Sequence, residues 1–369
     1  MLENLIPLAK PNIQETDINL VNDVLLSGML VQGKYVSQLE QRFVDFTKAS
    51  HASALSNGTA TLHLALKALN IGPGDEVIVP AFSYVATANV VEIIGAKPVF
   101  VDIELGTFNI DVSKIEDAIT SKTKAIIPVH EFGLACDIGK IIEISKKHGI
   151  YVIEDAACAL GATFNNMHVG TFGEFGSFSL HPRKAITSGE GGILITNNIN
   201  LDKKIKVLRN HGIEIINNEM EFSDFGFNYR MTDFQAALVY SQMDRVNKSI
   251  EHKTEIAEVY FNEIVSTNLI LPTTPSFTKH TWQTYHLLVD EKINRNDLIL
   301  KLKNNNIGAN YGAQCIPFMS AYKKKYNNDC ETLYPNALKS FLFGLAIPIH
   351  DFVTKEQAYE ISKILNKLT

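Results

Sequence analysis

The chain has 369 residues, of which 46% are hydrophobic and 20% charged, and its formal net charge at pH 7 is −6. This length can bury a large core in more than one domain, and the negative charge argues against a nucleic-acid-binding surface. No basic leader precedes an apolar segment, and no apolar run approaches the roughly 20 residues that span a bilayer. Four cysteines without CxxC spacing indicate a reducing compartment and no zinc site. We therefore expect a cytoplasmic protein without metal, nucleic-acid or membrane partners.

Two amphipathic helices are predicted near the N-terminus. The first covers residues 16–26 and ends at Gly28, and a turn-rich link, MLVQG, follows it. The second covers residues 36–48, with its large apolar side chains at helical spacing on one face.

The chain then alternates between strand and helix. Repeated β–α units with nearly continuous apolar strands predict a mostly parallel sheet covered by helices on both faces. Strands are predicted at residues 52–55, 76–79, 98–101, 125–129 and 151–154, and helices at 59–69, 84–94, 113–119 and 138–147.

The C-terminal half contains a long helix that links two domains. A helix at 202–209, an irregular Phe-rich stretch at 219–228 and a helix at 232–243 come first. The linking helix at 246–264 predicts a larger domain, residues 1–248, and a smaller C-terminal domain, residues 249–369. The smaller domain is predicted to hold a strand at 284–289 and helices at 295–304 and 354–367.

Two stretches carry residue types that suggest chemistry. GSFSLHPRKAITSGEGGILIT, residues 176–196, predicts a strand, a Gly-rich loop and a return strand, with Lys184 in the loop. YVIEDAACALGA, residues 151–162, predicts a buried strand that ends at Asp155, where open α/β sheets bind ligands. A lysine for a Schiff base and an acid for a pyridinium nitrogen suit pyridoxal phosphate. The alternatives are a surface lysine and an acid that caps a helix.

Taken together, EDAACALGA and SFSLHPRKAITSGEGG resemble the DegT/DnrJ/EryC1/StrS sugar aminotransferases, a branch of the aspartate-aminotransferase fold. The resemblance covers essentially the whole chain. It implies an α/β protein of pyridoxal phosphate fold type I, in which the large domain holds a mostly parallel, seven-stranded sheet and binds the cofactor. A smaller C-terminal α+β domain would meet the N-terminal segment, and the protein would form a homodimer.

A phosphate site is predicted at Ser56-Asn57-Gly58-Thr59, between a strand and a helix. Helix N-terminal N–H groups and a hydroxyl favour an anion, whereas the alternative is simple N-capping by Asn57 or Thr59. The resemblance implies that Gly58, Thr59 and Ser179 bind the cofactor phosphate. It also places Tyr84 over the pyridine ring, although the residues alone do not distinguish this from a core aromatic.

The resemblance gives the remaining pocket residues their roles. Asp155 would keep the pyridine nitrogen protonated, and Lys184 would bind the cofactor and then act as the general base. Cys158 departs from the family, which usually has Gln, His or Glu there near the ring hydroxyl, and a thiol donates only weakly. The loop PVHEFG matches one that lines the cofactor pocket, with Glu131-Phe132 replacing the usual Leu-Tyr after His130.

Further residues are implied at the substrate side. FNYRMTD resembles the family's GYNYRLTD segment, so Asn228 is predicted to reach the cofactor phosphate of the partner subunit. Arg230 would neutralise substrate phosphates or pair with Asp233. Met29 and His181 are candidates for the sugar cleft, and the alternatives are a helix cap and a packed loop histidine.

These residues predict a pyridoxal-phosphate-dependent aminotransferase. It would move an amino group from L-glutamate to a keto carbon, C4, of a nucleotide-linked 4-keto-6-deoxysugar, for surface glycan or O-antigen biosynthesis. A 3-keto-sugar aminotransferase and a sugar dehydratase on the same fold are alternatives, but the dehydratases carry histidine where this chain has Lys184. A nucleotide-binding dehydrogenase or a non-catalytic α/β binding module is disfavoured, because the first turn reads SNGTA instead of GxGxxG.

Overall fold

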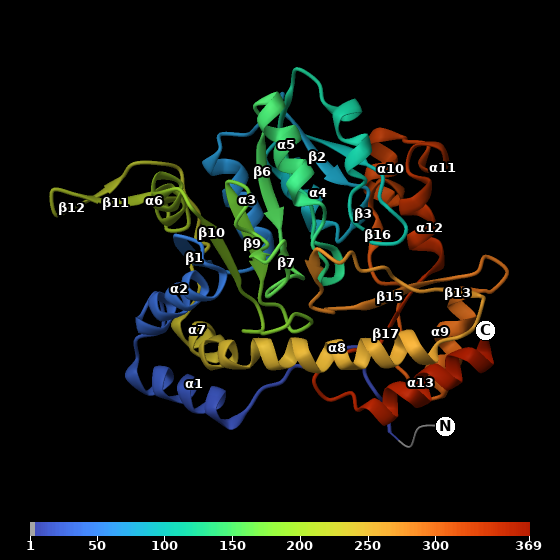
Figure 1. The fold of residues 1–369 in the computed structure, drawn as a ribbon. Helices are drawn as coiled ribbons and strands as arrows, with labels where there is room; N and C mark the ends of the chain where they lie inside the picture. Colours follow the sequence, from blue (N-terminus) through green and yellow to red (C-terminus); the bar gives the residue numbers. More distant parts are fainter. Residues whose placement is uncertain (1–3) are drawn as a thin grey trace.

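The protein is built around a central seven-stranded sheet, as Figure 1 shows for residues 4–369, which the computed structural model describes. The strand order is β1-β10-β9-β6-β5-β2-β4, and within it only β10 runs antiparallel to its neighbours. The mostly parallel sheet predicted from the sequence is therefore confirmed. Its strands are β1 (His51–Leu55), β2 (Glu76–Pro80), β4 (Lys97–Val101), β5 (Thr123–Ile126), β6 (Tyr151–Asp155), β9 (Phe175–Ser179) and β10 (Gly192–Thr196).

The two faces of this sheet each carry a hydrophobic core. Within β2, Ile78 belongs to one core, whereas Val77 and Val79 belong to the other, because successive strand side chains point to opposite faces. The first core is covered by α2 (Lys34–Thr47), α5 (Ile138–His148) and α7 (Asp233–Tyr240). The second is covered by α3 (Gly58–Ala68), α4 (Ala86–Ile93), α6 (Ile199–Leu208) and α12 (Pro335–Phe343).

A third core lies in the C-terminal part. The 18-residue helix α8 (Val246–Glu263) runs along one side of the molecule and enters this core (Figure 1). The N-terminal segment reaches the same region, since Ile6 pairs with Ile307 and is buried in this core. The elements here include a three-stranded sheet and two packed helices: β13 (Leu269–Ile270), β15 (Tyr285–Val289), β17 (Gly344–Ile347), α9 (Arg295–Asn304) and α13 (Lys355–Leu368).

The remaining elements are short or lie at the surface. The strands are β3 (Phe82–Ser83), β7 (Thr163–Phe164), β8 (Met167–His168), β11 (Ile213–Ile216), β12 (Glu219–Phe222), β14 (Thr278–Lys279) and β16 (Gln314–Cys315). The helices are α1 (Glu15–Ser27), α10 (Ser320–Tyr326) and α11 (Cys330–Leu333). Across residues 4–369, no helix is long and apolar enough to cross a membrane, and no group of three or more acidic, His or Cys side chains could hold a metal ion.

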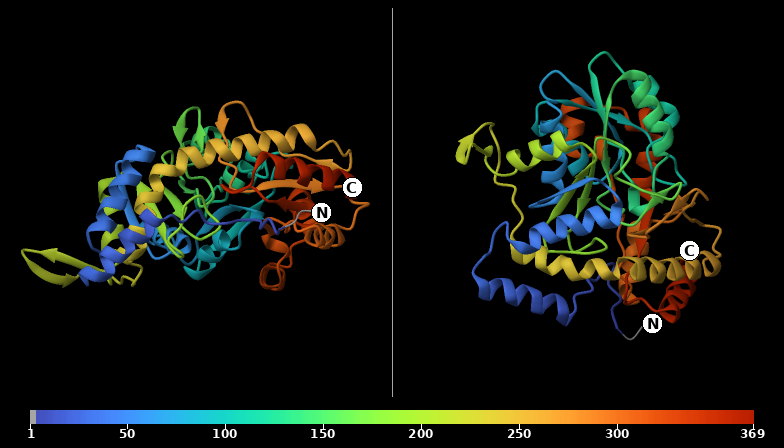
Figure 2. Two further views of the ribbon diagram at one scale, coloured as in Figure 1. Left: turned by 90° about the horizontal axis from the view of Figure 1, so that it is seen from below. Right: turned by 60° about the vertical axis from the view of Figure 1, so that its left-hand side comes forward.

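Two stretches adopt a different structure from the one that the sequence analysis assigned to them. Residues 113–119 form two 3-10 turns instead of one helix, since Val112, Ile115 and Ala118 recur at the three-residue period of that structure. Residues 219–228, predicted as irregular, begin with β12, which pairs with β11 in a hairpin that projects from the body (Figures 1 and 2).

Candidate active site

A cavity of about 810 Å³ opens at the carboxyl ends of the central strands. The C-terminal part closes it on one side through Gln283, Thr284, Gly312 and Ala313. Most of the site residues predicted from the sequence line this cavity: Asn57, Gly58, Thr59, Tyr84, Phe132, Asp155, Cys158, Ser179, His181 and Lys184. Residues predicted from separate stretches of the chain therefore share one site.

The loop that carries Lys184 is held in place by hydrogen bonds from side chains that pack against its backbone. It connects β9 to β10, whose end residues Ser179 and Gly192 pair with each other. The Gln242 side chain accepts from the Thr187 N–H at 3.0 Å and donates to the Thr187 carbonyl at 2.9 Å. Gln283 Nε2 donates to the Arg183 carbonyl at 2.9 Å. Backbone contacts on both sides of Lys184 thus fix where its side chain starts.

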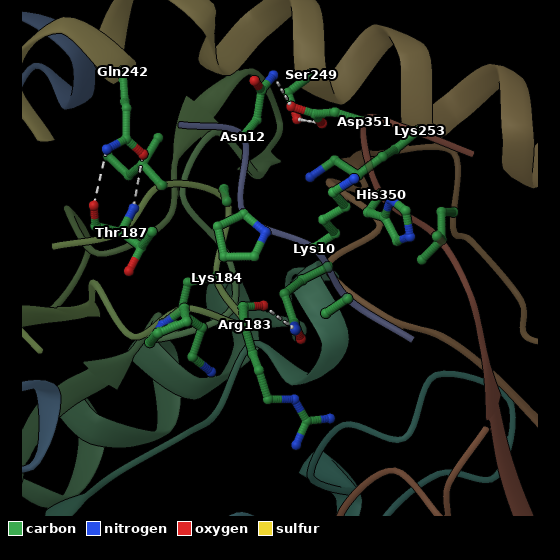
Figure 3. Close-up of a pocket in the computed structure, with 17 residues that line it drawn as sticks. Lys10, Asn12, Arg183, Lys184, Thr187, Gln242, Ser249, Lys253, His350 and Asp351 are labelled. Atoms are coloured by element: carbon green, nitrogen blue, oxygen red, sulfur yellow. Dashed lines mark hydrogen bonds between the residues drawn. The ribbon is translucent and has the colours of Figure 1, made fainter. Parts of the chain in front are cut away.

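Figure 3 shows the space behind this loop, where residues 9–12 pass between the loop and α8. The cavity there is only about 30 Å³, far smaller than the roughly 300 Å³ or more of a site for a cofactor or sugar. Asn12 Nδ2 donates to Asp351 Oδ2 at 2.8 Å, which ties the N-terminal segment to the C-terminal part. The lysine loop is therefore supported by both ends of the chain.

The Lys184 side chain points into the larger cavity, and its Nζ donates to Cys158 Sγ at 3.0 Å. Burial lowers the Lys184 pKa, but Cys158, Asp155 and Glu131 together outweigh burial, so the net pKa is raised. Burial raises the pKa of the Cys158 thiol. In the cofactor-free protein Lys184 Nζ is therefore held as a hydrogen-bond donor beside Cys158.

Asp155 is the last residue of β6 and is held in a fixed orientation. Its Oδ2 accepts from Thr87 Oγ1 at 2.9 Å, and its Oδ1 accepts from the Ala157 N–H at 3.2 Å. Burial raises the Asp155 pKa, whereas the two hydrogen bonds and the charge of Lys184 oppose this rise. The carboxyl group is thus buried, held by two hydrogen bonds and close to a cation.

An anion cradle forms where α3 begins. Asn57 is the N-cap and accepts from the Ala60 N–H at 2.8 Å, so the capping interpretation is correct for this residue. The first N–H groups of a helix lack partners within the helix. A Cβ at Gly58 would lie 2.8 Å from the Ser179 Cβ, so only glycine permits this close approach. The Ser179 hydroxyl and the first turn of α3 therefore lie side by side.

The donor set fits pyridoxal phosphate. The cradle at Gly58 and Ser179 suits its phosphate, Asp155 suits its pyridine nitrogen, and Lys184 suits its aldehyde. Tyr84 also lines the cavity, and its 66% exposed ring has free surface that a flat ligand ring can cover. Each polar end of the cofactor thus has a chemically suitable partner among the lining residues.

Three predicted substrate or partner residues lie outside this cavity. Asn228 and Met29 are exposed on the surface. Arg230 Nη1 donates to Asn210 Oδ1 at 2.6 Å, and Asp233 Oδ1 accepts instead from the Val36 N–H at 2.8 Å. The suggested ion pair between Arg230 and Asp233 is therefore wrong.

His130 also lies away from the cavity, although its loop matched a pocket-lining segment. It is fully buried and its Nε2 lies 3.0 Å from Glu154 Oε2. Glu154 accepts three further backbone N–H groups, from Gly170, Phe172 and Gly173. This network braces β6 beneath Asp155, and Glu131 and Phe132 are the residues after His130 that line the cavity.

Several lining residues were missed by the sequence analysis. Thr87 reaches Asp155 from the first turn of α4, Gln283 comes from the C-terminal part, and Arg183 borders the cavity. None follows a spacing pattern that points to the site. Glu131 was placed in the pocket-lining loop PVHEFG by the sequence analysis, but without a role of its own.

Comparisons with known proteins agree with this geometry. The chain is 36% identical to a GDP-perosamine synthase from Vibrio cholerae over 97% of both chains. It is 38% identical to a UDP-4-amino-4-deoxy-L-arabinose–oxoglutarate aminotransferase from Shewanella sediminis, over 88% of this chain and 86% of that protein. Both are named for products or substrates that are nucleotide-linked amino sugars.

A solved structure matches over almost the full length. The pyridoxal phosphate form of the putative sugar aminotransferase Spr1654 from Streptococcus pneumoniae superposes with a TM-score of 0.93 at 30% identity, covering 99% of this chain and 98% of that one. This confirms the predicted pyridoxal phosphate type I fold. The profile of the DegT/DnrJ/EryC1/StrS aminotransferase family matches residues 11–366. The chain belongs to the DegT/DnrJ/EryC1/StrS aminotransferase family and is a pyridoxal-phosphate-dependent aminotransferase.

Proposed function

We propose that this enzyme moves an amino group from L-glutamate to C4 of a nucleotide-linked 4-keto-6-deoxysugar. The observation that carries the proposal is the meeting of Lys184 with Asp155 in one cavity large enough for a cofactor and a sugar. The choice of C4 is supported by the arabinose relative, whose name specifies a 4-amino sugar and oxoglutarate. Oxoglutarate becomes glutamate when it accepts an amino group, which supports glutamate as the donor here.

Each residue has a task in the proposed reaction. The chemistry that pyridoxal phosphate supplies when bound is an electron sink for a carbanion. Gly58, Thr59 and Ser179 bind its phosphate, and Asp155, oriented by Thr87, holds a proton at its ring nitrogen.

Lys184 carries out the proton transfers in this proposal. Its Nζ first gives up to the solvent in the open cavity the proton that its acidic neighbours favour. As a neutral amine it then takes a proton from one carbon and returns it to another, which is general acid–base catalysis by one positioned group. The hydrogen bonds that hold the loop keep Nζ in place for both proton transfers.

The substrate side of the cavity has one cation that suits a nucleotide diphosphate. Arg183 lines the cavity next to Lys184, and in Figure 3 its guanidinium points away from the small cavity behind the loop. We assign Arg183 to the diphosphate, with His181 beside the sugar, because a guanidinium binds phosphate oxygens in pairs. Met29 and Arg230, which lie outside the cavity of a single chain, remain candidates for substrate contacts completed by a partner subunit.

The proposed enzyme acts as a homodimer, in which Asn228 reaches the partner subunit's cofactor phosphate. Apolar side chains are exposed on the projecting hairpin and the segment after it, with Phe225 93% exposed. They are also exposed at the end of α1, where Leu26 is 87% exposed. Large exposed apolar patches mark interaction surfaces, and a second copy would cover these.

Two broader statements belong to the same proposal. The chain divides into a cofactor-binding domain, 1–248, and a small domain, 249–369, which is supported by the separate third core and by α8 spanning the junction. The enzyme works in the cytoplasm and supplies an amino sugar for surface glycan or O-antigen synthesis, which is supported by its relation to a perosamine synthase.

The decisive experiment offers the purified enzyme glutamate with either a 4-keto or a 3-keto nucleotide 6-deoxysugar. We expect a product whose nitrogen is bonded to C4, identified by NMR, together with oxoglutarate. Amination only at C3 would refute the assignment of C4. Loss of a hydroxyl group without amination would show a dehydratase instead.

A further inference from the structure

Glu131 is a buried acid in the wall of the cofactor cavity, and the proposed reaction does not use it. Glu131 is only 5% exposed, and its Oε2 atom has no hydrogen-bond partner among residues 4–369. A buried polar atom without a partner is costly, so each one in a native structure calls for a reason. A ligand in the adjoining cavity is one such reason.

The backbone around Glu131 is built to hold this position. The Glu131 N–H donates to Asn109 Oδ1 at 2.9 Å. The next residue, Phe132, has φ of 55°, in the left-handed region that a bulky residue rarely adopts. The carbonyls of Phe132 and Gly133 each accept from an N–H of the C-terminal part, at 3.0 Å from Gln283 and Thr281. Strain of this kind persists where the surroundings over-determine it, often at functional sites.

The charged groups that face Glu131 come from three segments. Lys184 on the β9–β10 loop favours its carboxylate form, whereas Asp155 on β6 disfavours it. Glu131 in turn raises the pKa of the Cys158 thiol, which lies in the turn after β6. Burial is the largest influence and raises the Glu131 pKa to about 8. At pH 7 the group is therefore a neutral carboxylic acid, which can donate a hydrogen bond.

The donor set of the pocket leaves one part of the cofactor without a good partner. Pyridoxal phosphate has three polar parts besides its aldehyde, and Gly58 with Ser179 suits the phosphate while Asp155 suits the nitrogen. The ring oxygen remains, and Cys158 offers it only a weak thiol donor. Glu131 is the other uncharged acid in the same wall.

We propose that Glu131 is a cofactor-binding residue whose protonated carboxyl group donates a hydrogen bond to the ring oxygen of pyridoxal phosphate. This inference rests on the cofactor placement proposed above, and it does not depend on which sugar is the substrate. The strong hydrogen-bond donor that Cys158 does not provide to the ring oxygen would therefore come from a different segment of the chain.

The test measures cofactor affinity by equilibrium dialysis of pyridoxal phosphate against the purified protein. For Glu131→Leu, which removes the donor, we expect roughly tenfold weaker binding at neutral pH. Glu131→Gln keeps an N–H donor and should bind within about threefold of the wild type. Glu143→Leu, an exposed acid of α5, is the matched control and should bind as the wild type does.

A second measurement keeps the inference testable if Glu131→Leu folds poorly. As the pH rises through about 8, wild-type binding should weaken by more than Glu131→Gln binding, because only the wild type loses its donor. Unchanged affinity in a folded Glu131→Leu variant would overturn the inference, and so would identical pH profiles for the wild type and Glu131→Gln. If the wild type itself binds no pyridoxal phosphate, the cofactor placement fails instead.

Discussion

The protonated state of Glu131 makes a prediction about folding that is independent of any ligand. Its pKa is raised by burial from 4.5 to about 8 in the folded chain. Between these values the folded protein holds a proton that the unfolded chain has released. Stability falls with rising pH wherever the native state binds more protons, so Glu131 destabilises the cofactor-free protein increasingly from about pH 4.5 to about pH 8.

The size of this effect on the free energy of unfolding follows from the size of the Glu131 pKa shift. One proton gives a slope of about 1.4 kcal/mol per pH unit, and the full shift corresponds to roughly 5 kcal/mol. Glu131→Gln removes the titration but keeps the shape of the side chain. The difference in unfolding free energy between the wild type and this variant should therefore change by about 3 kcal/mol over two pH units, in favour of the variant at the higher pH.

Urea denaturation of the cofactor-free proteins at several pH values within this window measures the difference. The exposed control Glu143→Gln should follow the wild type at every pH, because its carboxylate is solvated in both states. A wild-type-to-Glu131→Gln difference that stays constant with pH would refute the reasoning, since it would mean that Glu131 titrates normally in the folded protein.

The other predictions concern catalysis. Asp155→Asn removes the carboxyl group that we propose lies at the ring nitrogen and should lower kcat roughly a hundredfold or more, measured by oxoglutarate release; a rate near that of the wild type would exclude Asp155 from the site. Thr87→Val removes a hydrogen bond to a buried carboxylate, worth about 1.5–3 kcal/mol, so turnover should fall about tenfold or more, whereas Thr254→Val on α8 should have no effect. Mixing Asn228→Ala with Lys184→Ala should restore activity if Asn228 acts across subunits, and no restoration would place it elsewhere.

The sequence predicted most of the sheet, together with Lys184 and Asp155 at the carboxyl ends of its strands. Lys184 and Asp155 were found because a lysine in a Gly-rich loop and an acid after a buried strand are chemically unusual placements. Thr87 and Gln283 were not found, because their roles come from segments that meet only in the folded chain. Ordinary residue types become site residues there through tertiary contact alone.

The errors in secondary structure have local causes. The hairpin of β11 and β12 turns at Asn217 and Asn218, both with positive φ, at 54° and 65°. This is the backbone of a tight hairpin turn, and Asn tolerates it, so the Asn-Asn pair was an overlooked signal. Both strands are almost entirely exposed, so no alternation of buried and exposed residues marks them in the sequence.

The central claim is that Lys184 carries the cofactor and the amino transfer, and an absorbance spectrum before and after addition of glutamate tests it most directly. We expect the purified protein to show the visible band of lysine-linked pyridoxal phosphate, and glutamate to convert it to the band of the aminated cofactor. Lys184→Ala should lack both the lysine-linked band and turnover. A wild-type protein without this band after incubation with pyridoxal phosphate, or a Lys184→Ala variant that retains activity, would contradict the account.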